Sequence, residues 1–273
     1  MPHRRYAVAL LAVLTAMLLA CLAAPALADE QLYRAQTIVT GIGEANRMTG
    51  FAACLEDVLI KVSGQLRLAG DPRLSPYERD AAKFVRDFSY RDEKGGKPKN
   101  DEQGTRDRSF VLTAEFDEAA VNGILAKLGS KPWLSRRPTL AVFAELNLSA
   151  RRLVVSADAG DTDLQRAALG AAAAKRGMPI VLPDAADLAG LGSGEQPLAA
   201  IAPGKLSEIA SRRGGEAVLT ARLVWDDRAL RWNSDWRLDG ERHRQRWRLS
   251  AVTFDETFRQ GIGRAAQILA GER

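Results

Sequence analysis

The chain begins with a strongly apolar segment. Residues 6–22 are almost wholly apolar, follow the basic pair Arg4-Arg5 and precede Ala26-Leu27-Ala28, which ends directly before Asp29. This order of basic, apolar and small residues is typical of a secretory signal peptide. With about 17 residues, the run is shorter than the roughly 20 that a membrane-spanning helix needs. We therefore predict a signal peptide over residues 1–28 and cleavage before Asp29.

The same apolar segment allows a second interpretation, in which the protein stays attached to a membrane. Leu18-Leu19-Ala20-Cys21 has the general form of a lipobox, and processing there would make Cys21 an acylated N-terminus. Leu19 fits this motif poorly, whereas Ala26 and Ala28 fit the pocket of a signal peptidase. We favour the cleaved and soluble form, and lipidation at Cys21 is the alternative.

Residues 29–135 are predicted to form an α+β domain. β-Branched residues over 33–41 indicate a strand, and apolar residues at helical spacing over 43–62 then indicate a helix. The order of the expected elements, β-α-α-β-β-α, is typical of helices packed on a small antiparallel sheet. The remaining elements are expected to be a helix over 76–88, strands over 89–92 and 108–116, and a helix over 117–128.

Residues 138–273 are predicted to form a second domain with a mixed α/β sheet. Prolines at 132 and 138, with a basic pair that we expect to be exposed, separate it from the first domain. Its expected strands cover residues 139–146, 152–157, 179–182, 216–225, 229–238 and 241–251, and its expected helices cover 164–176, 184–188, 203–213 and 254–269. A three-stranded meander and a closing helix would thus end the chain. The fold class is α+β or mixed α/β, with two small domains.

Composition narrows the function classes. The chain is 46% hydrophobic and 27% charged, which is typical of a folded protein. Only two histidines, His3 and His243, and two cysteines, Cys21 and Cys54, are present, so we expect no metal site, no disulfide framework and no cofactor. Removal of residues 1–28 leaves 37 basic and 34 acidic residues, a net charge of +3. So small an excess argues against nucleic-acid binding.

A polar segment between the last two strands of the first domain is one candidate site. We expect residues 95–108 to form a solvated hairpin loop, because they are polar and punctuated by glycine. The alternative is an enzyme that uses carboxylates of this loop as acid and base. We assign no catalytic residue, because neither a histidine nor a second carboxylate cluster completes a mechanism. The candidate binding residues of this loop are Asp101, Glu102, Gln103, Arg106, Asp107 and Arg108.

Arginine and tryptophan alternate along the last strands and form the main candidate site. Asp239-Gly240 predicts a two-residue turn in which paired residue numbers sum to 479, so that Trp232 faces Trp247 and Trp236 faces His243. We expect this tryptophan side to pack under the closing helix, against its apolar stripe with Phe258 and Ile262. The opposite side carries the candidate binding residues Arg231, Arg237, Arg242, Arg244, Arg246 and Arg248, with Asp235 as the only acid.

This arginine side has two interpretations. It is either a solvated sheet face or a binding surface for an anionic partner. A tight turn at Asp226-Asp227 would align Arg222, Arg231 and Arg248 in one row, and like charges that face each other across strands destabilise a sheet. Arginine also suits forked binding of phosphates and carboxylates. Because the predicted signal peptide implies export, the expected partner is an envelope protein or an anionic envelope component, with at most peripheral membrane contact.

Several long runs carry a resemblance to a known family. They are GFAACLEDVLIKVSGQLRL at 50–68, DPRL at 71–74, FVRDFSY at 84–90, DEQGTRDR at 101–108, LGSKPW at 128–133 and Arg137-Pro138. In these runs the chain resembles an uncharacterised exported family of Gram-negative bacteria, the domain-of-unknown-function family number 2066. The resemblance implies a periplasmic location and carries no activity. We expect a non-enzymatic envelope accessory or protein-binding module; the alternatives are the envelope enzyme described above and a lipid- or small-ligand-binding domain.

Overall fold

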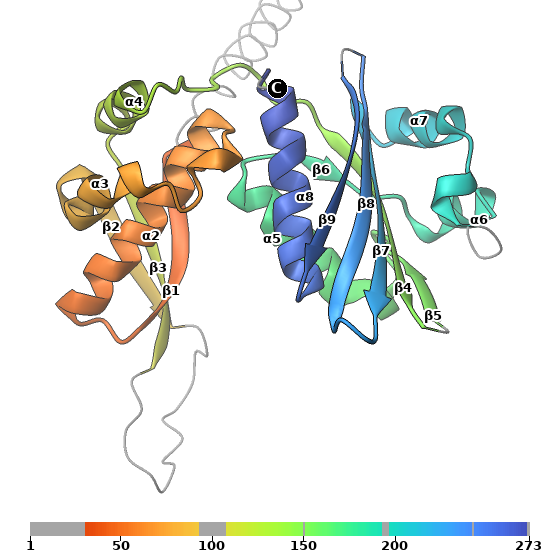
Figure 1. The fold of residues 1–273 in the computed structure, drawn as a ribbon, viewed down its shortest axis with the longest axis horizontal. Coiled ribbons are helices and arrows are strands. Elements are labelled where there is room, and N and C mark those ends of the chain that lie inside the picture. Colours follow the sequence, from red (N-terminus) through yellow and green to blue (C-terminus); the bar gives the residue numbers. More distant parts are fainter. Residues whose placement is uncertain (1–30, 93–107, 150, 193–196, 242, 272–273) are drawn as a thin grey trace, which may run out of the picture. The chain divides into compact units, whose positions relative to one another are not determined.

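The computed structural model describes residues 31–92, 108–149, 151–192, 197–241 and 243–271 (Figure 1). The predicted signal peptide lies outside these ranges. Contacts divide the chain into two compact units, Met1–Val58 with Pro76–Ile124 and Leu59–Ser75 with Leu125–Arg273. Residues 59–75 therefore group with the second unit, although they precede the domain boundary that was predicted near residue 135. The α+β class is confirmed, since one unit holds an antiparallel sheet and the other a mixed sheet.

The first unit has a three-stranded antiparallel sheet in the order β1-β3-β2. Helix α2 packs on it so closely that a Cβ at Gly50 would overlap the side chains of Leu112 and Val39. Cys54 on this helix is fully buried among apolar side chains such as Leu55 and Val58. The elements are β1 (Arg34–Thr40), α2 (Glu44–Ser63), α3 (Ser75–Arg79), β2 (Val85–Asp92), β3 (Ser109–Phe116) and α4 (Glu118–Lys127).

One predicted helix of this unit is wrong. We expected a helix over 76–88, but α3 ends at Arg79 and strand β2 already begins at Val85. In β2, Phe88 pairs with Ala114 of β3, and its ring contacts the edge of Phe51 with the ring centroids 5.3 Å apart. Long-range pairing and aromatic packing thus determine the conformation of residues 85–88, and a local apolar pattern does not contain that information.

The second unit has a six-stranded mixed sheet in the order β5-β4-β7-β8-β9, with β6 paired to β4. Strand β4 runs parallel to β6 and β7, and the other neighbours are antiparallel. The predicted meander and closing helix are confirmed. The elements are β4 (Leu140–Leu148), β5 (Arg151–Val154), α5 (Asp163–Lys175), β6 (Ile180–Val181), α6 (Ala185–Gly190), α7 (Pro203–Arg212), β7 (Ala217–Asp226), β8 (Arg231–Asp239), β9 (Arg244–Ala251) and α8 (Phe254–Leu269).

Helices cover the two faces of this sheet to different extents (Figure 1). Helices α5 and α8 lie on one face, over a core that includes residues of β4, β7 and β8. Helices α6 and α7 lie on the other face, where the buried cluster takes its sheet residues from β4 and β7. On that second face the side chains of Asp235, Arg246 and Arg248 are exposed. Strands β8 and β9 therefore present an open surface beside α7.

The tryptophan side of the meander packs under α8, as predicted. Trp236 is 2% exposed, stacks on Trp247 with ring centroids 6.1 Å apart, and meets the edge of Phe258 at 6.5 Å. Ile262 is fully buried in the same cluster. This packing leaves the opposite side chains of β8 and β9, including the arginines, on the open face.

Of the basic pair before β4, Arg136 is exposed and Arg137 is buried, which corrects the prediction that both are exposed. The guanidinium of Arg137 lies 4.5 Å from the ring centroid of Trp133 and donates hydrogen bonds to the carbonyl oxygens of Lys61 and Arg176. Burial lowers the pKa of Arg137 from 12.5 to about 10. The side chain therefore stays charged at neutral pH and binds backbone groups instead of an acid.

Glu216 joins the beginnings of β4 and β7. Its carboxylate accepts hydrogen bonds from the guanidinium of Arg136, one at 2.8 Å, and from the backbone N–H of Thr139 at 2.9 Å. The hydrogen bonds from Arg136 first, and that from Thr139 second, lower the pKa of Glu216 from 4.5 to about 2. The folded state thus favours the ionised carboxylate.

A pH titration of stability tests this role of Glu216. Because its pKa is lower in the folded state, its contribution should be complete above about pH 4.5 and should disappear as the pH falls towards 2. We expect wild type to be more stable than Glu216→Gln at pH 7, with a difference that shrinks through this range. Urea unfolding at several pH values measures the difference, and a difference that is constant from pH 7 to 2 would contradict the assignment.

Candidate functional site

The connection between β8 and β9 is longer than predicted. Asp239 pairs with Arg244, so that paired residue numbers sum to 483, and the N–H of Gly240 donates to the carbonyl oxygen of His243 at 2.9 Å. The predicted register is wrong: Trp236 faces Trp247, and His243 lies in the connection. Because the register differs by four residues, an even number, the side chains of Arg244–Ala251 in β9 keep the faces that were predicted for them.

The turn between β7 and β8 also differs from the prediction and brings opposite charges together. Asp226 pairs with Arg231, which places Arg222 opposite Asp235, and Asp235 in turn opposite Arg248. The expected row of Arg222, Arg231 and Arg248 is therefore wrong. An acid lies between two arginines in this row, and Nε of Arg248 donates to Asp235 at 2.8 Å.

The row continues inward to a buried acid. Glu145 of β4 lies opposite Arg222, and its carboxylate is 3.8 Å from Nε of Arg222. Glu145 is 1% exposed and also accepts a hydrogen bond from the backbone N–H of Leu198 at 2.8 Å. Charges thus alternate across four strands, from Glu145 to Arg248, so that every charged side chain in the row has an opposite charge on the neighbouring strand.

A second acid on the open face was missed by the sequence analysis. Asp239 was assigned to the turn, but it pairs with Arg244 at 3.7 Å and accepts a hydrogen bond from Nε of Arg237. The prediction that Asp235 is the only acid on this side is therefore wrong. Both acids neutralise arginines, so the surface carries less net charge than the sequence suggested.

One cross-strand pair brings two like charges together. Arg237 lies directly opposite Arg246, and among the registers described for this sheet it is the only pair of like charges that face each other. The side chain of Arg237 is 18% exposed, and its Nη2 atom is buried without a hydrogen-bond partner. Arg246 is exposed and has no ion-pair partner among the described residues.

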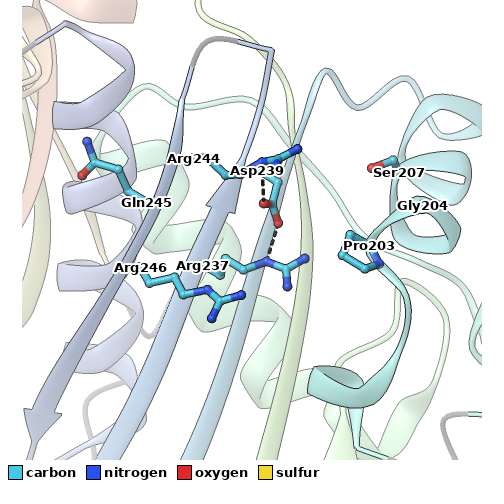
Figure 2. Close-up of a pocket in the computed structure, with 8 residues that line it drawn as sticks. All are labelled: Pro203, Gly204, Ser207, Arg237, Asp239, Arg244, Gln245 and Arg246. Atoms are coloured by element: carbon cyan, nitrogen blue, oxygen red, sulfur yellow. Dashed lines mark hydrogen bonds and ion pairs between the residues drawn. The ribbon is translucent and has the colours of Figure 1, made fainter.

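These two arginines line a groove next to α7, which we name the arginine groove. Figure 2 shows the arginines of β8 and β9, with Asp239 among them, across the groove from Pro203 and Ser207 of α7. Its volume is about 590 Å³. The lining residues are Pro203, Gly204, Ser207, Arg237, Asp239, Arg244, Gln245 and Arg246.

A second hollow adjoins the arginine groove along the sheet. It has a volume of about 570 Å³ and shares Arg237 and Arg246 with the groove. Its other polar lining residues include Arg222, Asp235 and Arg248, which belong to the alternating row. The Arg237–Arg246 pair therefore lies where the two hollows meet.

The other predicted site residues do not join this groove. Arg231 is at the far end of β8, opposite Asp226, and its Nε donates to the carbonyl oxygen of Ala229 at 3.5 Å. Arg108 belongs to the first unit, where it is 3.4 Å from Asp92. The candidates Asp101, Glu102, Gln103, Arg106, Asp107 and Arg242 lie outside the described residues.

The chemistry of the groove suits binding. Arginine stays protonated and offers forked donors, whereas the one carboxylate of the lining, Asp239, is already paired with Arg237 and Arg244. In the part of the chain that the structure describes, no three His, Cys, Asp or Glu side chains are grouped to hold a metal ion. The arrangement therefore supplies fixed positive charge and hydrogen-bond donors.

Comparison with known proteins gives a family of unknown function for part of the chain. A family model described as "Domain of unknown function (DUF8605)" matches residues 26–134. This match supports the expected resemblance to an uncharacterised family, but the number 2066 is not confirmed. No curated protein matches the chain. The matched segment ends before β4, so the family model does not extend to the arginine groove.

Proposed function

We propose that this protein is a non-enzymatic accessory module of the cell envelope that binds an anionic partner at the arginine groove. The observation that carries the proposal is the pair of opposed arginines, Arg237 and Arg246, in a concave surface whose one lining acid, Asp239, already pairs with Arg237 and Arg244. Every other charged cross-strand pair on β8 and β9 has an opposite charge facing it. A solvated face would not require two opposed guanidinium groups at the wall of a groove.

Location in the periplasm of a Gram-negative bacterium is the second part of this proposal. It is supported by the order of basic, apolar and small residues before Asp29. Among the described residues, no helix is both long and apolar enough to cross a membrane. In this proposal any membrane contact is peripheral, whereas in the lipoprotein alternative an acyl chain at Cys21 attaches the protein to the membrane.

The intact mass of the exported protein tests this location. Expression of the full chain in a Gram-negative host is expected to give a periplasmic protein that begins at Asp29. A mass that corresponds to an acylated N-terminus at Cys21 would support the lipoprotein alternative. An unprocessed leader in the membrane fraction would contradict both.

Partner capture from envelope extracts tests the binding role. We expect the triple variant Arg244→Gln, Arg246→Gln and Arg248→Gln to recover the wild-type partners about tenfold less well or worse at low salt, because three surface charges are lost. Wild-type recovery should itself fall as salt rises, since the Debye length shrinks from about 10 Å at 0.1 M to about 3 Å at 1 M.

A matched control separates the groove from total charge. The variant Arg151→Gln, Arg228→Gln and Arg259→Gln removes the same charge from exposed positions outside the groove and should behave like wild type. If the variant with Arg244, Arg246 and Arg248 replaced recovers the same partners at low salt as wild type does, the arginine face is only a solvated surface. The alternative of an enzyme that uses the Asp101–Asp107 carboxylates stays a prediction, since those residues lie outside the described ranges.

A further inference from the structure

We infer that the arginine groove is a site for a phosphoryl group, held between the Arg237–Arg246 pair and the first turn of α7. The inference rests on the proposed function, because it names the chemical group that the same surface would bind. Inorganic phosphate and the phosphate of a lipid headgroup share this chemistry.

Three arginines at one end of the sheet face share a single acid, because Asp239 pairs with both Arg237 and Arg244, and no ion pair is described for Arg246. Asp235 faces Arg248 and Asp239 faces Arg244, whereas the position between these two pairs on β8 holds Arg237, which faces Arg246. Opposed like charges destabilise neighbouring strands unless a counter-charge lies between them. An anion at this point would complete a face on which every other charged pair of β8 and β9 is already matched.

The hydrogen-bond donors of Arg237 are only partly used. Asp239 accepts from its Nε atom, while its Nη2 atom is buried and has no partner. A buried donor without an acceptor is costly, and such a group needs an explanation. Arg246, across the strand, has no ion-pair partner among the described residues and is free to close on an anion in the groove. The pair therefore offers several N–H donors to one acceptor group.

Helix α7 supplies the opposite wall of the groove. Pro203 and Gly204, the first two residues of this ten-residue helix, line the groove together with Ser207. The residue at the N-cap is Ala202, and no side chain caps the first turn. Pro203 has no N–H, and the N–H of Lys205 donates to the carbonyl oxygen of Ala202 at 3.0 Å, so the N–H of Gly204 and the helix dipole are what favour an anion at this end. The helix start and the arginine pair thus act on the same volume from two sides.

A phosphoryl group suits this arrangement better than a carboxylate does. It presents three or more oxygen atoms around one centre, so it can accept hydrogen bonds from both guanidinium groups and from the helix at the same time. A carboxylate has two oxygen atoms whose lone pairs lie in one plane, so it matches donors that converge from several directions less well than a tetrahedral phosphoryl group does. The groove, at about 590 Å³, admits such a compact group and the beginning of whatever carries it.

The experiment titrates the full processed protein with defined probes. Inorganic phosphate is followed by calorimetry and by arginine side-chain NMR, and flotation uses phosphatidylglycerol vesicles with pure phosphatidylcholine vesicles as the reference. Arg246→Gln is expected to weaken phosphate binding about 10- to 100-fold, as loss of a hydrogen bond to a charged group predicts. Arg246→Lys should bind phosphate more tightly than Arg246→Gln but less tightly than wild type, since lysine keeps the positive charge and lacks the two parallel N–H donors of a guanidinium group.

Arg231→Gln is the matched control, because it removes an arginine from the same strand face but outside the groove. Unchanged binding by this variant together with weak binding by Arg246→Gln supports the inference. Binding to phosphatidylglycerol vesicles alone, with the same dependence on Arg246, also supports it and identifies a lipid headgroup as the source. Equal phosphate binding by Arg246→Gln and wild type overturns it.

Two further outcomes separate this inference from the proposed function. If oligo-glutamate binds in an Arg246-dependent way and no phosphate probe does, the phosphoryl site is wrong while the anionic partner of the proposed function stands. If phosphate binding depends on Arg246 and the triple variant still captures every wild-type partner, the phosphoryl site stands and the proposed function fails.

Discussion

Gly261→Ala is expected to lower the free energy of unfolding of the second unit by about 3 kcal/mol. A Cβ atom at this position of α8 would overlap ring atoms of Trp236. The ring cannot move away, because Trp236 is 2% exposed and is held between the stacked ring of Trp247 and the edge of Phe258. The absence of a side chain at Gly261 therefore sets how closely α8 approaches the sheet.

The measurement is urea unfolding followed by near-ultraviolet circular dichroism of the tryptophans. Gly170→Ala in α5 is the matched control, since a Cβ there would meet no atom within 4 Å. Alanine is favoured over glycine within a helix by roughly 0.5–1 kcal/mol, so this variant should be neutral or slightly more stable. Equal unfolding midpoints for the two variants would show that Trp236 does not define the packing of α8.

The closing helix shows which elements could be predicted from the sequence. Its observed range, Phe254–Leu269, is the predicted one. Thr253 precedes Glu256 by the three residues of a capping box, and its side chain accepts a hydrogen bond from the backbone N–H of Glu256. Both signals, the cap and the apolar stripe, are local in the sequence. Where two local signals agree, tertiary packing has little to change.

The β8–β9 register shows why other features could not be predicted. The Asp239-Gly240 turn signal favours a two-residue connection, yet the observed register stacks Trp236 on Trp247 and pairs Asp235 with Arg248. These interactions join residues that lie 11 and 13 positions apart. Their combined free energy exceeds the preference of a single turn, so that the correct register depends on contacts that the local pattern does not contain.

The candidate site was found only in part for the same reason. Arginines at alternate positions of a predicted strand indicate a charged face, and this identified Arg237, Arg244 and Arg246. The opposite wall comes from Pro203 and Gly204, more than thirty positions earlier in the chain. Only the packing of α7 beside β7 brings this helix start to the arginines, and a sequence pattern marks the helix start without showing what it faces.

Arg137→Met is expected to destabilise the second unit by about 2–4 kcal/mol. The guanidinium donates to the carbonyl oxygen of Lys61, in the last turn of α2, and to that of Arg176, the residue that caps the C-terminal end of α5. The C-terminal end of a helix carries partial negative charge and unpaired carbonyl groups. Methionine fills a similar volume but leaves both carbonyl groups without this donor.

Two further variants test whether the effect depends on the positive charge, on the two-pronged hydrogen bonding of the guanidinium, or on the buried position of Arg137. Arg136→Gln removes the neighbouring exposed arginine, which pairs with Glu216, and should cost well under half as much as Arg137→Met. Arg137→Lys keeps the positive charge near both helix ends but cannot donate to two carbonyl groups in a fixed fork, so its unfolding free energy should fall between those of wild type and Arg137→Met. If Arg137→Lys matches wild type in urea unfolding, charge alone stabilises these ends. If Arg137→Met matches wild type, the buried guanidinium is dispensable, and packing of its aliphatic part against Trp133 accounts for its place in the fold.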